Sequence, residues 1–293
     1  MKKHSIAIVG AGKVGCALAE TLYSRGYPLA GIASRTLDSA ALLAQRFGVP
    51  SSTCPSAITA KADIVFITTP DRYIGEVVSQ IANNGGFRKE QYVYHTCGSL
   101  TAAILQIAKN CGAFIGSLHP LQTFASTEIA ITNLPGSFFS LDGDPEAAKL
   151  AETIISVIGG QSFFVPAADR AAYHAAACIA SNYLVALAHY ASSIFGRFGL
   201  SQEEAMLALL PLLRGTVDNL ASLGTIKALT GPISRGDTAT VVGHLAALDS
   251  LGHEQDLYRR LGLYTLQLVR EQRNLEQTQT MELDKVLREA KRG

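Results

Sequence analysis

The stretch SIAIVGAGKVGCALAETLYSR, residues 5–25, decides the fold of this chain. Its first five residues are mostly apolar, and they lead directly into a turn with glycines at positions 10, 12 and 15. A helical pattern follows the turn, and a second apolar run occupies residues 29–33. This order predicts a strand, a glycine turn, a helix and a second strand, which is the opening unit of a parallel α/β sheet.

The glycine turn has the form G-x-G-x-x-G, which suits a dinucleotide. Gly10 allows a tight turn, Gly12 lets the backbone approach a pyrophosphate, and Gly15 lets helix and strand pack closely. Lys13 and Val14 stand at the helix start, where unpaired N–H groups can bind phosphate oxygens. A glycine turn of an unrelated α/β protein is the alternative, but the position between a strand and a helix favours a dinucleotide site.

The end of the second strand indicates which dinucleotide is bound. An NAD site usually has Asp or Glu about 20 residues after the glycine turn, but this chain has Ser34, Arg35 and Thr36. A guanidinium can pair with a 2′-phosphate, and the neighbouring hydroxyls can donate to it. The sequence therefore predicts NADP(H), unless Arg35 is only a solvated residue before a helix.

Further candidate residues follow other predicted strands. Ligands of an open parallel sheet lie outside the carboxyl ends of its strands, so Thr69 and Pro70 should meet the cofactor, and Ser99 and His119 should face the nicotinamide. A histidine with a pKa near neutrality can give a proton to a developing alkoxide. A structural histidine in a turn before proline is the alternative. Asp71 either contacts the ligand or caps the next helix.

Composition excludes several classes of protein. The net charge is +1 with 17% charged residues, so no basic field favours nucleic acid or an anionic membrane. The five cysteines form no C-x-x-C pair, which is typical of reduced thiols in a cytoplasmic protein. No histidine cluster has the spacing of metal ligands, so we expect no metal.

Beyond Pro166 only helical patterns remain, over residues 170–198, 201–223, 238–250 and 254–292. We therefore expect a Rossmann-like domain at 1–166 and an all-helical domain at 167–293. Residues 171–196 contain no Asp, Glu, Lys or Arg, which is long enough for a membrane span. Their alanines, serines and histidines instead favour a helix buried inside a soluble protein or oligomer.

That uncharged helix has a polar stripe, because several of its residues follow spacings of three and four. The stripe consists of His174, Cys178, Ser181, Asn182 and His189, with Val185 on the same side of the helix. Buried polar groups need partners, and a cleft between two domains would supply them. Alternatively, these groups satisfy one another inside the core.

The segment LTGPISRGD, residues 229–237, is a loop with glycines, hydroxyls and both signs of charge. Its composition suits recognition of a carboxylate, with Arg235 as the charged fork. An ordinary turn in which Asp237 caps the next helix is the alternative.

These motifs together resemble one known family. They are the glycine turn, SRT at 34–36, TP at 69–70, HTCGSL at 95–100, SLHP at 117–120, YH at 173–174, ASNY at 180–183, TGP at 230–232 and RGD at 235–237. The family is the bacterial one that joins a Rossmann-like domain to a helical C-terminal domain of formerly unknown function, within the 6-phosphogluconate dehydrogenase superfamily. The resemblance implies an NADP-dependent oxidoreductase that forms a homodimer through its helical domains.

The resemblance also bears on the site residues. Some members look like an alternative class of ketopantoate reductase, an enzyme of pantothenate biosynthesis. Ordinary ketopantoate reductases have Lys and Asn one turn apart on the corresponding helix, where this chain has His174 and Cys178, with Asn182 a further turn on. Prephenate dehydrogenases have a similar Gly-Ser loop and His-Pro step, which favours Ser99 and His119 as catalytic residues.

We therefore expect reduction of a small 2-keto acid by NADPH, with ketopantoate as the best single substrate. The expected roles are His119 or His174 as general acid, Ser99 and Asn182 as donors to the reacting oxygen, and Ser181 and Arg235 as substrate contacts. The alternatives are a hydroxyacid dehydrogenase, an imine reductase of the pyrroline-carboxylate type, and an NADP(H)-binding sensor without turnover.

Overall fold

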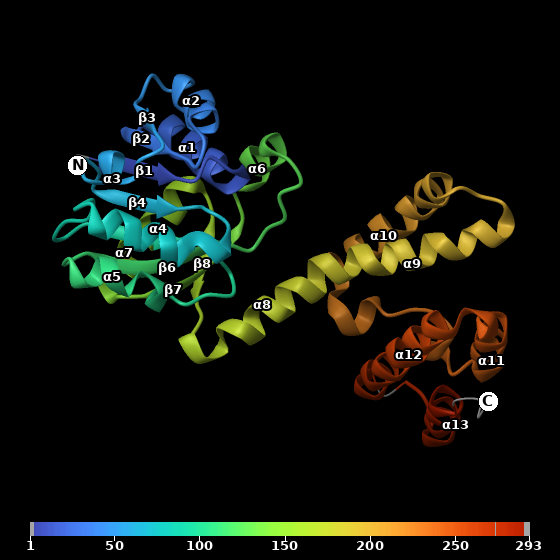
Figure 1. The fold of residues 1–293 in the computed structure, drawn as a ribbon. Helices are drawn as coiled ribbons and strands as arrows, with labels where there is room; N and C mark the ends of the chain where they lie inside the picture. The colour runs from blue at the N-terminus through green and yellow to red at the C-terminus, as the bar shows by residue number, and fades with distance from the viewer. Residues whose placement is uncertain (1–2, 273, 290–293) are drawn as a thin grey trace. The chain divides into compact units, whose positions relative to one another are not determined.

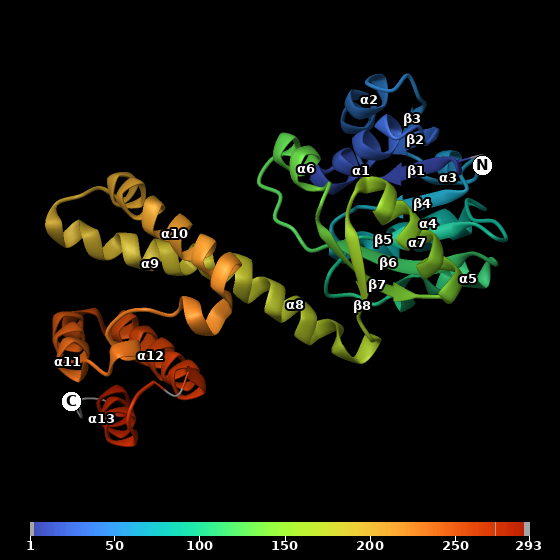
Figure 2. The ribbon, with the colours of Figure 1, turned by 180° about the vertical axis from the view of Figure 1, so that it is seen from behind.

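The structure is a computed structural model, which describes residues 3–272 and 274–289. They divide into two compact units, one ending at Tyr183 and the other beginning at Leu184. The first unit contains a sheet with helices on both faces, and the second unit is helical (Figures 1 and 2).

Eight strands form one sheet in the described residues, in the order β3-β2-β1-β4-β5-β6-β7-β8. The strands are β1 (Ile6–Val9), β2 (Leu29–Ala33), β3 (Ser51–Ser52), β4 (Ile64–Ile67), β5 (Tyr92–His95), β6 (Phe114–Pro120), β7 (Phe138–Gly143) and β8 (Gln161–Phe164). Neighbours from β3 to β6 are parallel, whereas β7 is antiparallel to β6 and parallel to β8. The strands β1, β2, β4, β5 and β6 therefore present their carboxyl ends at the same end of the sheet.

Helices cover both faces of the sheet (Figure 1). One face packs against α1 (Lys13–Ser24), α2 (Leu37–Gln45), α6 (Thr127–Asn133) and α7 (Pro145–Ile158). The other packs against α3 (Ser56–Thr59), α4 (Ile74–Asn83) and α5 (Gln106–Asn110). All residues of β1 and β4 are buried, because parallel strands covered on both faces have no side exposed to water.

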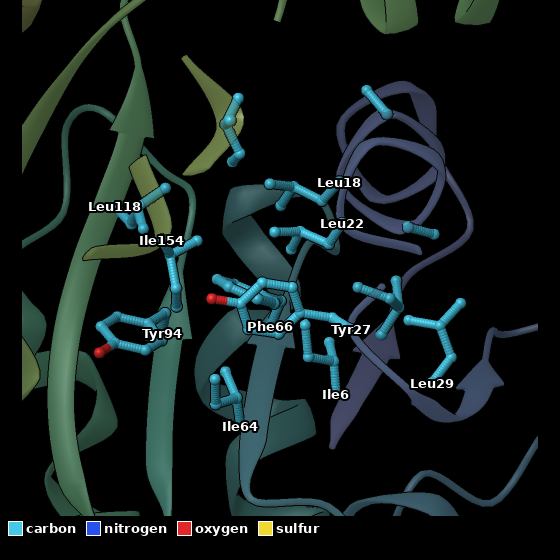
Figure 3. Packing of buried hydrophobic residues seen from close by; sticks show 14 of the residues in the cluster. Ile6, Leu18, Leu22, Tyr27, Leu29, Ile64, Phe66, Tyr94, Leu118 and Ile154 are labelled. Carbon is cyan, nitrogen blue, oxygen red and sulfur yellow. The ribbon is translucent and has the colours of Figure 1, made fainter. Parts of the chain in front are cut away.

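An aromatic pair lies at the centre of this core (Figure 3). The rings of Phe66 and Tyr94 stack with their centroids 5.5 Å apart. The Tyr94 hydroxyl donates to the carbonyl of Ala147 at 2.7 Å. The phenol is thus satisfied while its ring fills the core, and the bond joins α7 to the sheet.

A long helical run extends from Ala167 to Phe198. It contains α8 (Arg170–Cys178), a π-helical turn (Ile179–Tyr183) and α9 (Leu184–Phe195). By length and composition alone it is apolar enough to cross a membrane, and no residue of its most apolar window is buried.

The second unit continues with α10 (Gln202–Ala228), α11 (Thr238–Ala247), α12 (Gly252–Gln272) and α13 (Gln277–Arg288). Ser201 and Glu204 form a capping box at the start of α10. Asp237 caps α11, since its carboxylate accepts from the Thr240 N–H at 3.0 Å. A small apolar core consists of Ile233, Val241, Leu245, Leu266, Val269, Leu283 and Leu287.

The predicted fold class, a Rossmann-like α/β domain followed by a helical domain, is confirmed. The single helix predicted over residues 254–292 is wrong, because Glu276 and Gln279 form a capping box that starts a separate helix, α13. Residues 273 and 290–292 of that prediction lie outside the described part. The α/β elements end with β8, before the predicted boundary near Pro166, while α8 beyond it belongs to the first compact unit.

Candidate functional site

The glycine turn lies between β1 and α1. Gly10 has a φ of +119°, and a Cβ there would lie 2.6 Å from the carbonyl carbon of Thr68. Thr68 follows β4 and donates its hydroxyl to the Gly10 carbonyl at 2.7 Å. Only glycine fits this position, because both the backbone conformation and the close approach exclude a side chain.

The space in front of α1 suits a pyrophosphate. The helix begins at Lys13 without a side-chain cap on its first N–H groups, and a Cβ on Gly12 would meet no atom within 4 Å. A Cβ on Gly15 would collide with the Gly10 carbonyl, so the helix packs tightly against the turn. The Thr69 hydroxyl is buried without a hydrogen-bond partner in the described residues. Uncapped N–H groups, an open approach and an unpaired hydroxyl fit phosphate oxygens.

The loop after β2 contains the residues predicted to select the cofactor. Arg35 is exposed, and its guanidinium has no ion pair or hydrogen bond among the described residues. The Thr36 hydroxyl donates to that of Ser39 at 2.8 Å, and the Ser34 N–H donates to the carbonyl of Ser52 at 3.1 Å. An unpaired guanidinium between two hydroxyl residues fits a 2′-phosphate.

Two histidines meet where β5 and β6 end. His119 is the next-to-last residue of β6, and His174 lies on α8. Gly98 lies in the loop after β5, and a Cβ there would lie 2.7 Å from Cδ2 of His174 and 2.8 Å from Nε2 of His119. The centroids of the two imidazole rings are 6.3 Å apart. The structure thus brings together both histidines that are predicted as proton donors. They lie against the loop after β5, which can approach both rings only because residue 98 has no side chain.

Each histidine has a side-chain partner. The Nδ1 atom of His119 lies 2.7 Å from the hydroxyl oxygen of Tyr173, and Nδ1 of His174 lies 3.8 Å from the sulfur of Cys178. Burial lowers the pKa of His119 to about 4, and the positive charge of Arg170 contributes. The expected pKa near neutrality is therefore not found. At neutral pH His119 is a neutral imidazole, which donates at one nitrogen and accepts at the other.

Arg170, the first residue of α8, is only 1% exposed. Its guanidinium donates to the carbonyls of Leu100 and Cys97, each at 3.2 Å, to the hydroxyl of Ser140 at 3.0 Å and to the hydroxyl of Ser117. A buried cation requires such partners, because an uncompensated interior charge costs several kcal/mol. These bonds hold α8 against the loop after β5 and against strands β6 and β7.

The loops after β4 and β5 add polar groups beside the histidines. Ser99 is exposed, and its hydroxyl oxygen lies 3.2 Å from the sulfur of Cys97. Asp71 makes no capping hydrogen bond to the turn that it begins. The negative charge of Asp71 acts to raise the pKa values of His95 and His119, against the larger lowering effect of burial. The predicted contact of Asp71 with a ligand stays a prediction.

The polar stripe predicted on the long helix is interrupted. The π-helical turn contains an extra residue per turn and changes the phase of the side chains beyond it. Within this turn Ser181 is half-buried and Asn182 is exposed, and neither side chain has a hydrogen-bond partner among the described residues. His189, beyond the turn, lies 3.2 Å from the amide nitrogen of Gln202 in the second unit. The single stripe is therefore two separate groups.

Arg235 ends a 3₁₀ turn (Ile233–Arg235) in the second unit. Its side chain is exposed and has no hydrogen bond or ion pair in the described residues. Its charge contributes to lowering the pKa of Asp237, although the hydrogen bonds of that carboxylate to Thr240 contribute more. The role of Arg235 towards a substrate carboxylate stays a prediction.

Two protein-family models match the chain. Residues 1–120 match a Rossmann-like domain, and residues 137–265 match DUF2520, a domain of unknown function. The chain is thus similar to a Rossmann-like domain in its first part and to a DUF2520 domain in its later part. This order of domains confirms the predicted resemblance. The DUF2520 match begins at β7 and contains Arg170 and His174, so the histidine cluster combines residues from both matched regions.

Solved structures agree with this arrangement. Protein TM1727 from Thermotoga maritima is 28% identical with a TM-score of 0.76, and the match covers 92% of this chain and 100% of that chain. BF3122 from Bacteroides fragilis, a proposed NADP oxidoreductase, is 25% identical with a TM-score of 0.70 and coverages of 88% and 96%. A 1-pyrroline-5-carboxylate reductase from Streptococcus pyogenes shares the fold at 16% identity, with a TM-score of 0.62 and coverages of 97% and 97%. No curated protein matches this chain.

Two residues of the site were not among the predicted site residues. Arg170 reads in the sequence as an ordinary helix start after Asp169, and its burial depends on partners from three distant segments. Tyr173 belongs to the YH motif, and its spacing of three from Arg170 places both on one side of α8. That spacing is the signal that would have joined them to His174.

Proposed function

We propose that this DUF2520 protein is an NADPH-dependent oxidoreductase that reduces a small 2-keto acid, with 2-dehydropantoate as the first substrate to test. The observation that carries this proposal is the position of the glycine turn and the histidine cluster at the same end of the parallel strands β1, β4, β5 and β6. Similarity to BF3122 supports the cofactor class. We also propose that the protein acts in pantothenate biosynthesis in the cytoplasm, where its five free cysteines would stay reduced.

NADPH, when bound, supplies the hydride, and the protein supplies position and charge. The pyrophosphate would be surrounded by Gly10, Gly12, Lys13, Val14, Gly15, Thr69 and Pro70. The 2′-phosphate would be surrounded by Ser34, Arg35 and Thr36. His119 or His174 would give the proton to the reacting oxygen. Ser99 and Asn182 would donate hydrogen bonds to that oxygen, and Ser181 and Arg235 would bind the rest of the substrate.

The test is NADPH consumption by the purified protein with a panel of 2-keto acids headed by 2-dehydropantoate, repeated with NADH. His119→Ala or His174→Ala should reduce turnover by about a hundredfold for the residue that supplies the proton. His253→Ala, an exposed histidine of the second unit, is the matched control. Turnover with NADPH preferred supports the proposal, and NADPH binding without turnover of any 2-keto acid refutes the substrate class.

A second candidate, an imine reductase, is favoured by the Asp71 carboxylate beside the histidine cluster. A negative charge there would stabilise a cationic iminium group. Cyclic imines, beginning with 1-pyrroline-5-carboxylate, therefore belong in the same panel, as do 2-hydroxy acids for the oxidative direction. Tight NADPH binding with no turnover of any carbonyl, imine or alcohol would instead support the alternative function, an NADP(H)-binding sensor without turnover.

We also propose that the protein is a homodimer through its helical domain. Large apolar side chains are exposed along α9 and α10, namely Leu184, Val185, Leu207, Leu212, Val217, Leu220 and Leu223. Such a surface indicates an interaction site, and a second copy would cover it without invoking a membrane. Analytical ultracentrifugation without detergent tests this, and recovery of the protein only in the membrane fraction would contradict it.

A further inference from the structure

His95, the last residue of β5, is completely buried and binds both ends of the loop that follows it. Its Nδ1 atom accepts from the backbone N–H of Cys97 at 3.2 Å, and its Nε2 atom lies 3.1 Å from the carbonyl oxygen of Thr101. A backbone N–H only donates and a carbonyl only accepts. The imidazole is therefore neutral, with Nδ1 unprotonated and its single proton on Nε2.

Two further buried side chains bind the same loop. The guanidinium of Arg170 donates to the carbonyls of Cys97 and Leu100. The carboxylate of Asp142 accepts from the N–H of Ala102 at 2.8 Å, where the loop ends. Together with the imidazole, these two groups bind five backbone groups of the loop and its end.

His95 and Asp142 belong to one row of side chains across the sheet. His95 pairs with Ser117 on β6, and Ser117 pairs with Asp142 on β7, so the three side chains share one face. The Ser117 hydroxyl accepts from Arg170 as well. Buried polar groups are costly unless they are hydrogen-bonded, and a satisfied network of them is rigid. The row therefore holds the loop in one conformation.

Gly98 and Ser99 lie between these points of attachment. Residue 98 is the position that approaches His119 and His174, and the side chain of Ser99 is exposed. We propose that His95 is a positioning residue, whose Nε2-protonated imidazole ties the two ends of the loop and so keeps Gly98 and Ser99 at the histidine cluster. For its catalytic consequence this inference rests on the proposed function, in which Ser99 donates to the reacting oxygen.

The tautomer and the loop can be measured without cofactor or substrate. In full-length protein labelled with ¹⁵N-histidine, His95→Gln assigns the His95 resonances by their loss. Nδ1 should show the shift of an unprotonated nitrogen, and Nε2 that of a protonated one. The Cys97 amide should exchange slowly although it lies in a loop, because its acceptor is buried. A protonated Nδ1, or a Cys97 amide that exchanges as fast as those of exposed loops, would overturn the inference.

Two substitutions separate the hydrogen bonds of His95 from its volume. Glutamine offers one acceptor and one donor in place of the two ring nitrogens, whereas leucine offers neither. His95→Leu should therefore speed exchange of the Cys97 amide and, in an active enzyme, lower kcat by about tenfold or more. The Kd for NADPH should stay near its wild-type value, because the glycine turn is untouched. His95→Gln should recover most of both losses.

Gln91, completely buried directly before β5, provides the matched control. Its Nε2 atom donates to the carbonyls of Thr59 and Ala62, each at 2.8 Å. Gln91→Leu should lower stability as His95→Leu does, yet leave kcat and the exchange of the Cys97 amide intact. Wild-type kcat in His95→Leu, or an equal loss in Gln91→Leu, would refute this inference alone. The expected tautomer and slow exchange, together with no turnover of any 2-keto acid, would refute the proposed function alone.

Discussion

Arg35 is the residue on which the choice between two nearly identical cofactors depends. Arg35→Asp exchanges an unpaired cation for a carboxylate that repels a 2′-phosphate. The Kd for NADPH should therefore rise at least about tenfold more than the Kd for NADH, since hydrogen bonds to charged groups contribute about 1.5–3 kcal/mol. Calorimetry measures both constants. Arg260→Asp, an equal charge change on an exposed residue of the second unit, is the control, and equal losses for both cofactors would rule out NADP(H) selection by Arg35.

His95 makes stability depend on pH. It is completely buried, and burial lowers its pKa to about 4, whereas the unfolded residue titrates near about 6.5. Between these values the unfolded chain binds more protons, so stability falls as the pH falls from 6.5 to 4. His95 accounts for at most about 3 kcal/mol of this loss. Urea unfolding at several pH values should show a weaker dependence for His95→Gln, and an unchanged dependence would exclude His95 as a cause.

Single residues with local roles were predictable from the sequence, and those with distant partners were not. Gly10, Gly12 and Gly15 were predictable because their spacing between a strand and a helix is a local pattern, although the close approach of Thr68 to Gly10 was not part of that pattern. The burial of Arg170 depends instead on oxygens of segments 30 to 73 residues away in the chain. A cation at a helix start is also locally unfavourable, so nothing in the local pattern indicates it.

At the scale of elements, the approach of α8 to the loop after β5 depends on Gly98. This residue has no positive φ, so Gly98→Ala acts only through the added methyl group, which would collide with both imidazoles. We expect turnover to fall at least about tenfold and stability to fall by about 1–3 kcal/mol. Gly243→Ala, where a methyl group meets no atom within 4 Å, should leave turnover intact. Wild-type kinetics of Gly98→Ala would show that the histidines need not approach this loop.

The existence of the elements was more predictable than their details. The buried strands and the capping box at Ser201 follow from local patterns. The short α6 is capped by Ser126, whose side chain accepts from the Ile129 N–H, but its sequence lacks a clear apolar period. The π-helical turn (Ile179–Tyr183) interrupts a helical pattern in which no residue signals it.

At the scale of the whole molecule, the exposed apolar surface of α9 and α10 predicts association. Leu212 is 67% exposed on α10, and a charge there should oppose burial against a second copy. Leu212→Glu should therefore shift the protein from dimer to monomer in light scattering after gel filtration. Leu42→Glu, on α2 of the first unit, changes a leucine that is 74% exposed and should leave the dimer intact. A wild-type monomer, or a dimer insensitive to Leu212→Glu, would contradict the proposed interface.

The buried guanidinium of Arg170 also determines where evolution can exchange one module of this protein for another. A recombination point just after Val165 would keep every strand, yet leave the oxygens of Leu100, Cys97, Ser117 and Ser140 without their cation. A point beyond Tyr183 would keep that cation together with Tyr173 and His174. If recombination joins this α/β domain to a different helical domain, α8 must therefore stay with the α/β domain. The segment that is exchanged as one unit is then longer than the α/β fold alone.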